Sequence, residues 1–137
     1  YSSLVKKQKL FSEINAFIAG SHDEGLFTIS GKLLDGVTFD TAEKAILKEI
    51  KSIKQELVKE DELTKVKNKI ESTTQFSETS VLNKAMSLSF AELLGNANDV
   101  NSEVENYQKV AAKGINRIAN EILNETNCST LIYAKSK

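Results

Sequence analysis

The chain has 137 residues, of which 40% are apolar and 27% charged, and its 18 basic and 19 acidic side chains leave a net charge of −1. This balance excludes the global electrostatic field that would attract nucleic acid or an anionic membrane surface. No apolar run approaches the roughly twenty residues needed to cross a bilayer, so no membrane span is expected.

The N-terminal third predicts the end of a helix followed by a β-hairpin. Residues 1–9 are typical of the last turns of a helix, with Leu4 and Val5 facing inward and the lysines outward. The alternation in "LFSEINAFIAG" predicts a strand that places Phe11 on the face opposite Ile14. The polar run "SHDEG" supplies turn residues, and "LFTISGKLL" then predicts the second strand of a hairpin.

A helix is predicted in "DGVTFDTAEKAILKEIKSIKQEL", which carries its own start signal. Either Thr38 or Asp40 can cap this helix, because either side-chain oxygen can accept a backbone N–H of the first turn. Asp40 together with Glu43 resembles a capping box. The stripe expected to face the core consists of Ala42, Ala45, Ile46, Ile50, Ile53 and Leu57.

Further helices are predicted in the second half of the chain. In "VKEDELTKVKNKIESTTQF" the acids at positions 60–62 suit the positive N-terminal end of a helix. The residues of this helix expected to be buried are Leu63, Val66 and Ile70. The helix in "SVLNKAMSLSFAELLG" stops at Gly95 and is the most apolar, so it is expected to be the most buried. A short helix near residues 100–110 and a helix in "GINRIANEIL" follow.

The closing run "CSTLIYAK" has strand composition and is expected to join the sheet of the hairpin. The order of elements predicts an α+β fold, a small mainly antiparallel sheet with helices packed on one face. Because there is no proline, linker or repeat, residues 1–137 are expected to form a single domain. The chain begins inside a predicted helix, which indicates a fragment of a longer protein with a fourth strand upstream of Tyr1.

The residues by themselves indicate no catalytic or metal site. His22 is the only histidine, and a zinc site needs three or four ligands, so we expect "SHDE" to be an exposed hairpin loop. The run "KEDEL" lacks the alternating ligands of a calcium loop, and its acids are explained by the helix start. The hydroxyl-rich "KNKIESTTQFSETS" lacks a histidine base, so it predicts a solvated helix face and a loop. Cys128 is expected to be a small buried hydrophobe rather than a nucleophile.

Three stretches carry a resemblance to a known family. The run "SSLVKKQKLFSEINAFIAGSHDEGLFTISGKLLDGVTFDTAEKAILKEI" strongly resembles the bacterial branch of the insulinase/pitrilysin zinc peptidases, which include the mitochondrial processing peptidases. "VKEDELTKVKNKIES" is similar to a helix of that family, and "SVLNKAMSLSFAELLGNANDVNSEVENYQKVAAKGINRIANEIL" is similar to its tail. The resemblance covers essentially the whole chain and is carried by the ordered set, not by one diagnostic motif.

The resemblance implies that the chain is most of the second subdomain of one peptidase half. In this family two homologous halves close like a clamshell, and each half has two related α/β subdomains. The zinc site, an inverted H-x-x-E-H with a downstream glutamate, lies in the first subdomain of the catalytic half. This chain has no H-x-x-E-H, so the resemblance implies no catalytic or metal residue here and zinc in the parent's other subdomain.

The family also places an arginine and a tyrosine in the second subdomain of the half without zinc, where they help to bind substrate and stabilise the transition state. Laid without gaps on "LVKKQKLFS", these positions fall on Val5 and Ser12, so neither residue type is kept. The departure argues against a direct catalytic role and suggests that this subdomain belongs to the zinc-bearing half.

Three functions stay open. The first is a non-catalytic supporting subdomain of a zinc metalloendopeptidase that hydrolyses peptides in an enclosed chamber, with the remaining subdomains and a peptide substrate as partners. The second is an inactive peptidase homologue that acts as a partner or scaffold subunit, in a homo- or hetero-dimer. The third ignores the resemblance and is a binding module that dimerises through an open sheet edge. The sequence favours neither the periplasm nor the cytoplasm of a bacterium.

Overall fold

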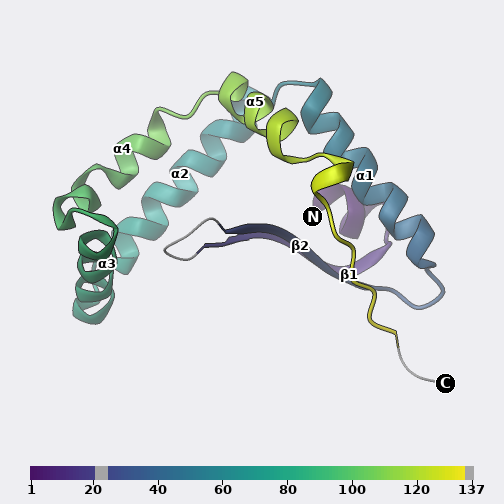
Figure 1. Ribbon diagram of the computed structural model, residues 1–137, viewed down its shortest axis with the longest axis horizontal. Coiled ribbons are helices and arrows are strands. Elements are labelled where there is room, and N and C mark those ends of the chain that lie inside the picture. Colours follow the sequence, from purple (N-terminus) through teal and green to yellow (C-terminus); the bar gives the residue numbers. More distant parts are fainter. Residues whose placement is uncertain (21–24, 135–137) are drawn as a thin grey trace. The chain divides into compact units, whose positions relative to one another are not determined.

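The computed structural model describes residues 1–20 and 25–134 (Figure 1). The chain divides into two compact units, unit 1 (Tyr1–Ile53 with Ile122–Lys137) and unit 2 (Lys54–Glu121). Unit 1 contains a β-hairpin with helices and unit 2 is helical, so the predicted α+β class is confirmed. In the described ranges, every helix is too short or too polar to traverse a lipid bilayer.

Unit 1 begins with η1 (Ser2–Lys7), a short π-helix where the sequence predicts the end of a helix. Lys9 then adopts a positive φ of 52°, which ends the helix and turns the chain into the first strand. The N–H of Leu10 donates to the carbonyl of Leu4 at 3.0 Å across this turn. Leu4 itself is buried and faces inward, as predicted.

Strands β1 (Phe11–Ala19) and β2 (Leu26–Leu33) form the predicted antiparallel hairpin, which is the whole of the sheet in the described residues. Their register is regular except for one shift, at which Ser12 is an extra residue in β1. This is a β-bulge. The Ser12 hydroxyl donates a hydrogen bond to the carbonyl of Lys32 on the other strand at 3.1 Å.

The bulge explains why the predicted faces of β1 are wrong. Strict alternation places residues three apart on opposite faces, but an inserted residue shifts the alternation by one position. Phe11 and Ile14, which lie on either side of the bulge, are therefore both buried in one cluster. They form the core of unit 1 together with Leu4 and Ala42.

Helix α1 (Phe39–Gln55) follows the hairpin and is capped by one of the two predicted residues. Thr38 Oγ1 accepts the N–H of Thr41 at 3.3 Å and shares a hydrogen bond with Thr41 Oγ1 at 2.9 Å. Asp40 lies inside the first turn, where it is well placed for the helix dipole but is not the cap. The predicted capping box of Asp40 and Glu43 is therefore wrong.

The buried stripe of α1 packs on the core of unit 1. Ala42 is buried, and the predicted stripe is at least half-buried as far as Ile53. Leu57 lies beyond the end of the helix and is exposed, so its predicted burial is wrong. A hydrogen bond of 2.6 Å from the Ser3 hydroxyl to Glu49 Oε1 also ties η1 to α1. Both helices therefore contribute to the core that also holds the hairpin.

The segment of residues 128–134 forms no strand and does not pair with the hairpin, so the predicted third strand is wrong. Thr130 Oγ1 donates to Glu43 Oε1 of α1 at 3.3 Å, while Leu131 and Tyr133 are 95% and 94% exposed. Strand composition expresses how well side chains fit a half-buried pleated surface, and these side chains meet no such surface.

Unit 2 is built from α2 (Glu60–Ser77), α3 (Val81–Leu94), η2 (Ala97–Ser102), α4 (Glu103–Gln108) and most of α5 (Ala112–Ile122). The first turn of α2 is acidic, as predicted. Lys67 Nζ of α2 donates to the carbonyl of Gln108 in α4 at 2.8 Å. Leu63 is buried as predicted, but Val66 is 50% exposed, because α4 has six residues and covers only part of α2.

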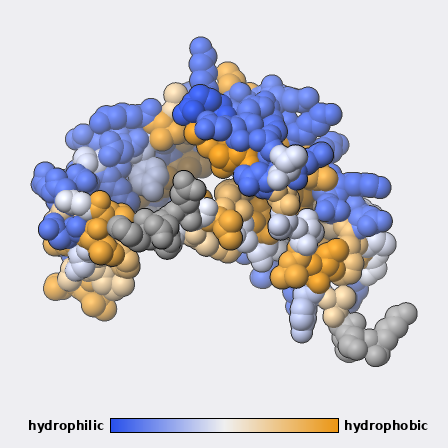
Figure 2. Space-filling view, viewed as in Figure 1, coloured by the Kyte–Doolittle hydropathy of each residue, from blue (hydrophilic) through white to orange (hydrophobic). Residues whose placement is uncertain are grey.

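Helix α3 has the termini that the sequence predicts. Ser80 Oγ accepts the N–H of Asn83 at 3.4 Å, and Gly95, with φ 140°, ends the helix. None of the 14 residues of α3 is buried, however, so the prediction that it is the most buried helix is wrong. Figure 2 shows hydrophobic side chains uncovered over this helix, at the lower left. Among the described elements, η2 alone packs extensively on α3, and it is only six residues long.

Candidate functional site

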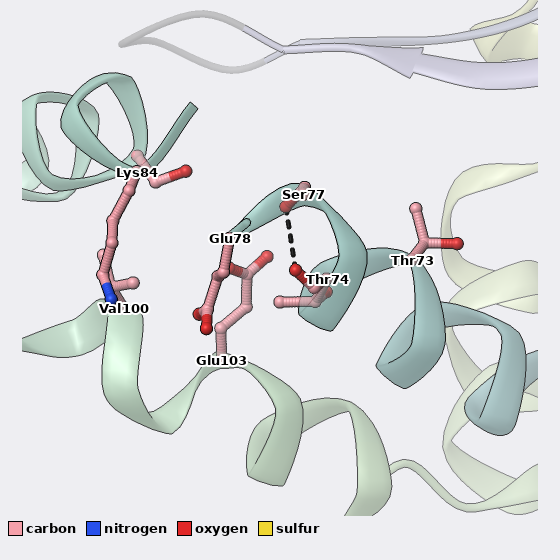
Figure 3. A pocket seen from close by; sticks show the side chains of 8 residues that line it. Thr73, Thr74, Ser77, Glu78, Lys84, Val100 and Glu103 are labelled. Atoms are coloured by element: carbon pink, nitrogen blue, oxygen red, sulfur yellow. Dashed lines mark hydrogen bonds between the residues drawn. The ribbon is translucent and has the colours of Figure 1, made fainter. Parts of the chain in front are cut away.

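A polar pocket of about 180 Å³ lies in unit 2, where α2 ends and α3, η2 and α4 come together (Figure 3). It is lined by Thr73, Thr74, Ser77, Glu78, Lys84, Ser87, Val100 and Glu103. Four of these side chains are hydroxyls, two are carboxylates and one is an ammonium group. The pocket is therefore a candidate for binding a small polar group.

The hydroxyl-rich end of α2 folds around its own backbone. The Ser77 hydroxyl donates to the carbonyl of Thr74 at 2.9 Å, which is the dashed line in Figure 3. The N–H of Glu78 donates to the same carbonyl at 3.1 Å. Short polar side chains commonly satisfy carbonyl groups at a helix end in this way. This local bonding ends α2 at Glu78, whose side chain joins the lining of the pocket.

The remaining polar groups come from elements later in the chain. Lys84 lies in the first half of α3, and Glu103 is the first residue of α4. Figure 3 shows the side chains of Glu78 and Glu103 on the same side of the pocket, with Lys84 beside Val100. The sequence interpretation of this region as a solvated helix face and loop is confirmed for the end of α2. No local sequence pattern predicted that Lys84 and Glu103 would lie beside the end of α2, because their approach depends on the chain folding back through η2.

Hydroxyl groups are the candidate nucleophiles among the described residues of the pocket. A serine or threonine hydroxyl needs an adjacent base, and neither histidine nor cysteine is among the described residues that line this site. The hydroxyl of Ser77 is engaged with a backbone carbonyl. Over residues 1–20 and 25–134, no group of three or more His, Cys, Asp or Glu side chains is arranged to hold a metal ion.

Among the described residues, the hydroxyl-rich run at the end of α2 is the one stretch singled out by the sequence that lines this pocket. His22 and its two acidic neighbours lie outside the described residues. Cys128 is exposed, so the prediction that it is a buried hydrophobe is wrong, because the strand in which it was expected to lie does not form. Val5 packs against the core of unit 1. Ser12 occupies the bulge of β1 and bonds to Lys32.

Comparison with protein families identifies the group to which the chain belongs. A family model described as "Peptidase M16 inactive domain" matches residues 1–70, which is just over half of the 137 residues. The chain belongs to the Peptidase M16 inactive-domain family. The predicted resemblance to the insulinase-type zinc peptidases is thereby confirmed. The matched region spans η1, the hairpin, α1 and the first part of α2.

Solved structures extend the likeness of the M16 inactive domain to the whole chain, as a likeness of fold. The inactive peptidase domain of a "putative zinc protease" from Bordetella parapertussis superposes with a TM-score of 0.84 at 20% identity. The alignment covers 100% of this chain and 74% of that one. A "putative zinc protease" from Bordetella pertussis Tohama I gives 0.84 at 20% identity, covering 99% and 75%.

A protease from Helicobacter pylori superposes with a TM-score of 0.85 at 18% identity. The alignment covers 92% of this chain but 30% of the Helicobacter protein, so this M16 inactive domain spans less than a third of that protease. A search of the curated proteins found no match.

Proposed function

We propose that this M16 inactive domain is a non-catalytic supporting part of a zinc metalloendopeptidase, in which it packs beside a zinc-bearing subdomain and helps to enclose a peptide substrate. The observation that carries the proposal is the match of residues 1–70 to a peptidase inactive domain. The fold of the Bordetella parapertussis inactive domain supports the same reading over the rest of the chain.

The described residues do not fit a zinc centre. Such a centre needs three or four histidine, cysteine or carboxylate ligands, and no such group converges among them. In the proposed enzyme the zinc ion would be held by another subdomain, where a bound zinc ion lowers the pKa of a water molecule for attack on a carbonyl. No step of the hydrolysis is assigned to side chains of this chain.

Val5 and Ser12, on which an ungapped placement of the family's arginine and tyrosine falls, have structural uses in this chain. Val5 is part of the apolar layer around the core of unit 1. The Ser12 hydroxyl closes the bulge against Lys32. Both uses agree with a supporting role. In the family, the arginine supplies a positive charge and the tyrosine a phenol hydroxyl, and valine and serine supply neither group.

The same two positions are also compatible with a second candidate function, an inactive homologue that acts as a partner or scaffold subunit. The two candidates differ in whether the gene encodes a zinc motif upstream of Tyr1. A supporting subdomain requires an in-frame H-x-x-E-H with a downstream glutamate. A scaffold subunit would lack that motif and would act beside a separate catalytic chain.

The test is to sequence the gene upstream and to measure zinc content and hydrolysis of a fluorescence-quenched peptide. We expect the full gene product to bind zinc and cleave the peptide, and residues 1–137 to do neither. Hydrolysis should be lost when the glutamate of the upstream motif is replaced by glutamine. Stoichiometric zinc and peptide cleavage by residues 1–137 would overturn the proposal. An upstream region without the motif would favour the scaffold function.

A further inference from the structure

We propose that an uncovered apolar stripe on α3 is the docking site for a further segment of the same peptidase domain, a segment for which this chain has no counterpart. The stripe consists of Leu82, Met86, Phe90 and Leu93, and is called the α3 stripe below. The inference rests on the proposed function only in that the chain is part of a larger domain. It does not require that the larger protein be active.

The members of the α3 stripe lie on one side of the helix. Their spacings of four, four and three residues keep successive side chains on the same face. Their exposed fractions are 69, 50, 60 and 63% in chain order. Two small residues, Ala85 and Ser89, lie between them, and with Met86, Phe90 and Leu93 they line an open groove of about 270 Å³. The stripe thus offers both projecting side chains and a recess between them.

The α3 stripe carries no charge. The charged side chains of α3 are Lys84 and Glu92, and at 100° per residue both lie well away from the stripe. Lys84 lines the polar pocket, together with Ser87 of the same helix. Helix α3 therefore presents Lys84 and Ser87 to the pocket, while the α3 stripe is uncovered. Contiguous uncovered apolar surface on a soluble protein marks a contact with another apolar surface.

The solved relatives indicate what supplies that surface. The Bordetella parapertussis inactive domain contains the whole of this fold, but this chain covers only 74% of it. The Bordetella pertussis protein leaves a similar remainder, with 75% covered. About a quarter of a domain of this type is thus additional to the elements described above. At a rise of about 1.5 Å per residue the stripe is roughly 16 Å long, so one added helix or strand pair would cover it.

The area of the α3 stripe argues against a second copy of the chain as its occupant. The four side chains of the stripe expose on the order of 500 Å², whereas a stable dimer buries about 800 Å² on each partner. A segment of the same polypeptide does not pay the entropy of association and so needs less surface. The expected occupant is accordingly an apolar, uncharged face of a segment within the same domain.

The experiment measures how fast a thiol on the stripe reacts with N-ethylmaleimide in the full gene product. Because Cys128 is exposed, the variants are made in a Cys128→Ser background. Met86→Cys reports on the stripe, and Ser87→Cys is the matched control on the same helix. We expect native labelling of Met86→Cys to be at least about tenfold slower than in urea, and that of Ser87→Cys to change by less than about threefold.

Each remaining outcome decides for or against the proposal. Labelling of Met86→Cys must become fast when the gene product is cut back to residues 1–137. Equal labelling of the two variants in the full product would overturn the proposal. Protection that persists in residues 1–137, or that disappears on dilution, would also overturn it, since the occupant would then be this chain or a second copy. Protection in a product without zinc or peptidase activity would uphold it while the proposed function failed.

Discussion

The ring of Phe11 lies over Gly31 on the neighbouring strand, and this contact leaves no room for a methyl group at position 31. A Cβ atom there would lie 2.8 Å from Cδ1 of Phe11 and 3.3 Å from the carbonyl oxygen of Glu13. The ring is buried in the core of unit 1. It cannot turn aside without opening a cavity, because protein cores are close-packed. The glycine is therefore required by packing and not by its backbone angles.

We expect Gly31→Ala to lower the free energy of unfolding by about 1–3 kcal/mol, as inserted carbons in packed cores do. Urea-induced unfolding followed by far-ultraviolet circular dichroism measures this change. Ser30→Ala, at the adjacent exposed position, is the control and should change stability by less than about 0.5 kcal/mol. Similar values for the two variants would mean that the ring moves away freely.

Cys128 shows how a single residue can be misjudged from its neighbours in sequence. It precedes a run of apolar residues, and free cysteine is among the most often buried residue types. Burial, however, needs a second surface, and residues 128–134 have no strand partner among the described residues. The composition of this run indicates that its side chains suit a half-buried sheet. It does not indicate whether the chain provides a sheet for the run to join.

At the scale of elements, the start of α1 offers a direct test of the two caps that the sequence leaves open. Thr38→Ala should lower the free energy of unfolding by about 0.5–2 kcal/mol, because the N–H of Thr41 loses its acceptor. Asp40→Asn removes only a first-turn charge and should cost about 0.3–1 kcal/mol, less in high salt. Thermal unfolding in low and high salt compares them. A salt-independent loss of about 0.5–2 kcal/mol for Asp40→Ala, beyond that of Asp40→Asn, would identify Asp40 as the cap, because asparagine can still accept the N–H and alanine cannot.

Helix α3 separates what local sequence predicts from what it does not. Its limits at Ser80 and Gly95 follow from local hydrogen bonding and backbone geometry, so both were predictable. Its exposure was not, because burial depends on an apolar surface supplied from elsewhere. Strand β1 is a second example, because the bulge at Ser12 exchanges the two faces of the strand. No glycine or proline lies at the bulge, so the local sequence did not predict it.

At the scale of the whole molecule, Leu4 and Val66 were both predicted to face inward, but only Leu4 does so. Leu4→Ala should lower the free energy of unfolding by about 2–5 kcal/mol, because it empties part of the core of unit 1. Val66→Ala, in unit 2, should change it by less than about 0.5 kcal/mol. Denaturant unfolding of the two variants provides the comparison. A large effect at Val66 would mean that its side chain is covered in solution.

The fold was predictable to the extent that it is local. The hairpin, the helix limits and the α+β class follow from alternation, capping and helical spacing. The family followed from the ordered run of residues, and its model match covers η1 through the first part of α2. The polar pocket was not predictable, since Lys84 and Glu103 reach it only when the chain folds back through η2. The exposure of α3 and of residues 128–134 depends in the same way on surfaces distant in sequence.

The bulge at Ser12 also bears on the colloidal behaviour of the protein. A two-stranded sheet presents unpaired backbone groups along its edges, and regular edges invite intermolecular cross-β pairing. A bulge increases the local twist of its strand, and a twisted ladder is a poor template for a flat incoming strand. Lys32 lies opposite the bulge, so both the twist and a positive charge disfavour intermolecular strand pairing at this end of the hairpin. Deletion of Ser12 would straighten the edge and should therefore raise the rate of fibril formation, as a dye-binding assay can measure.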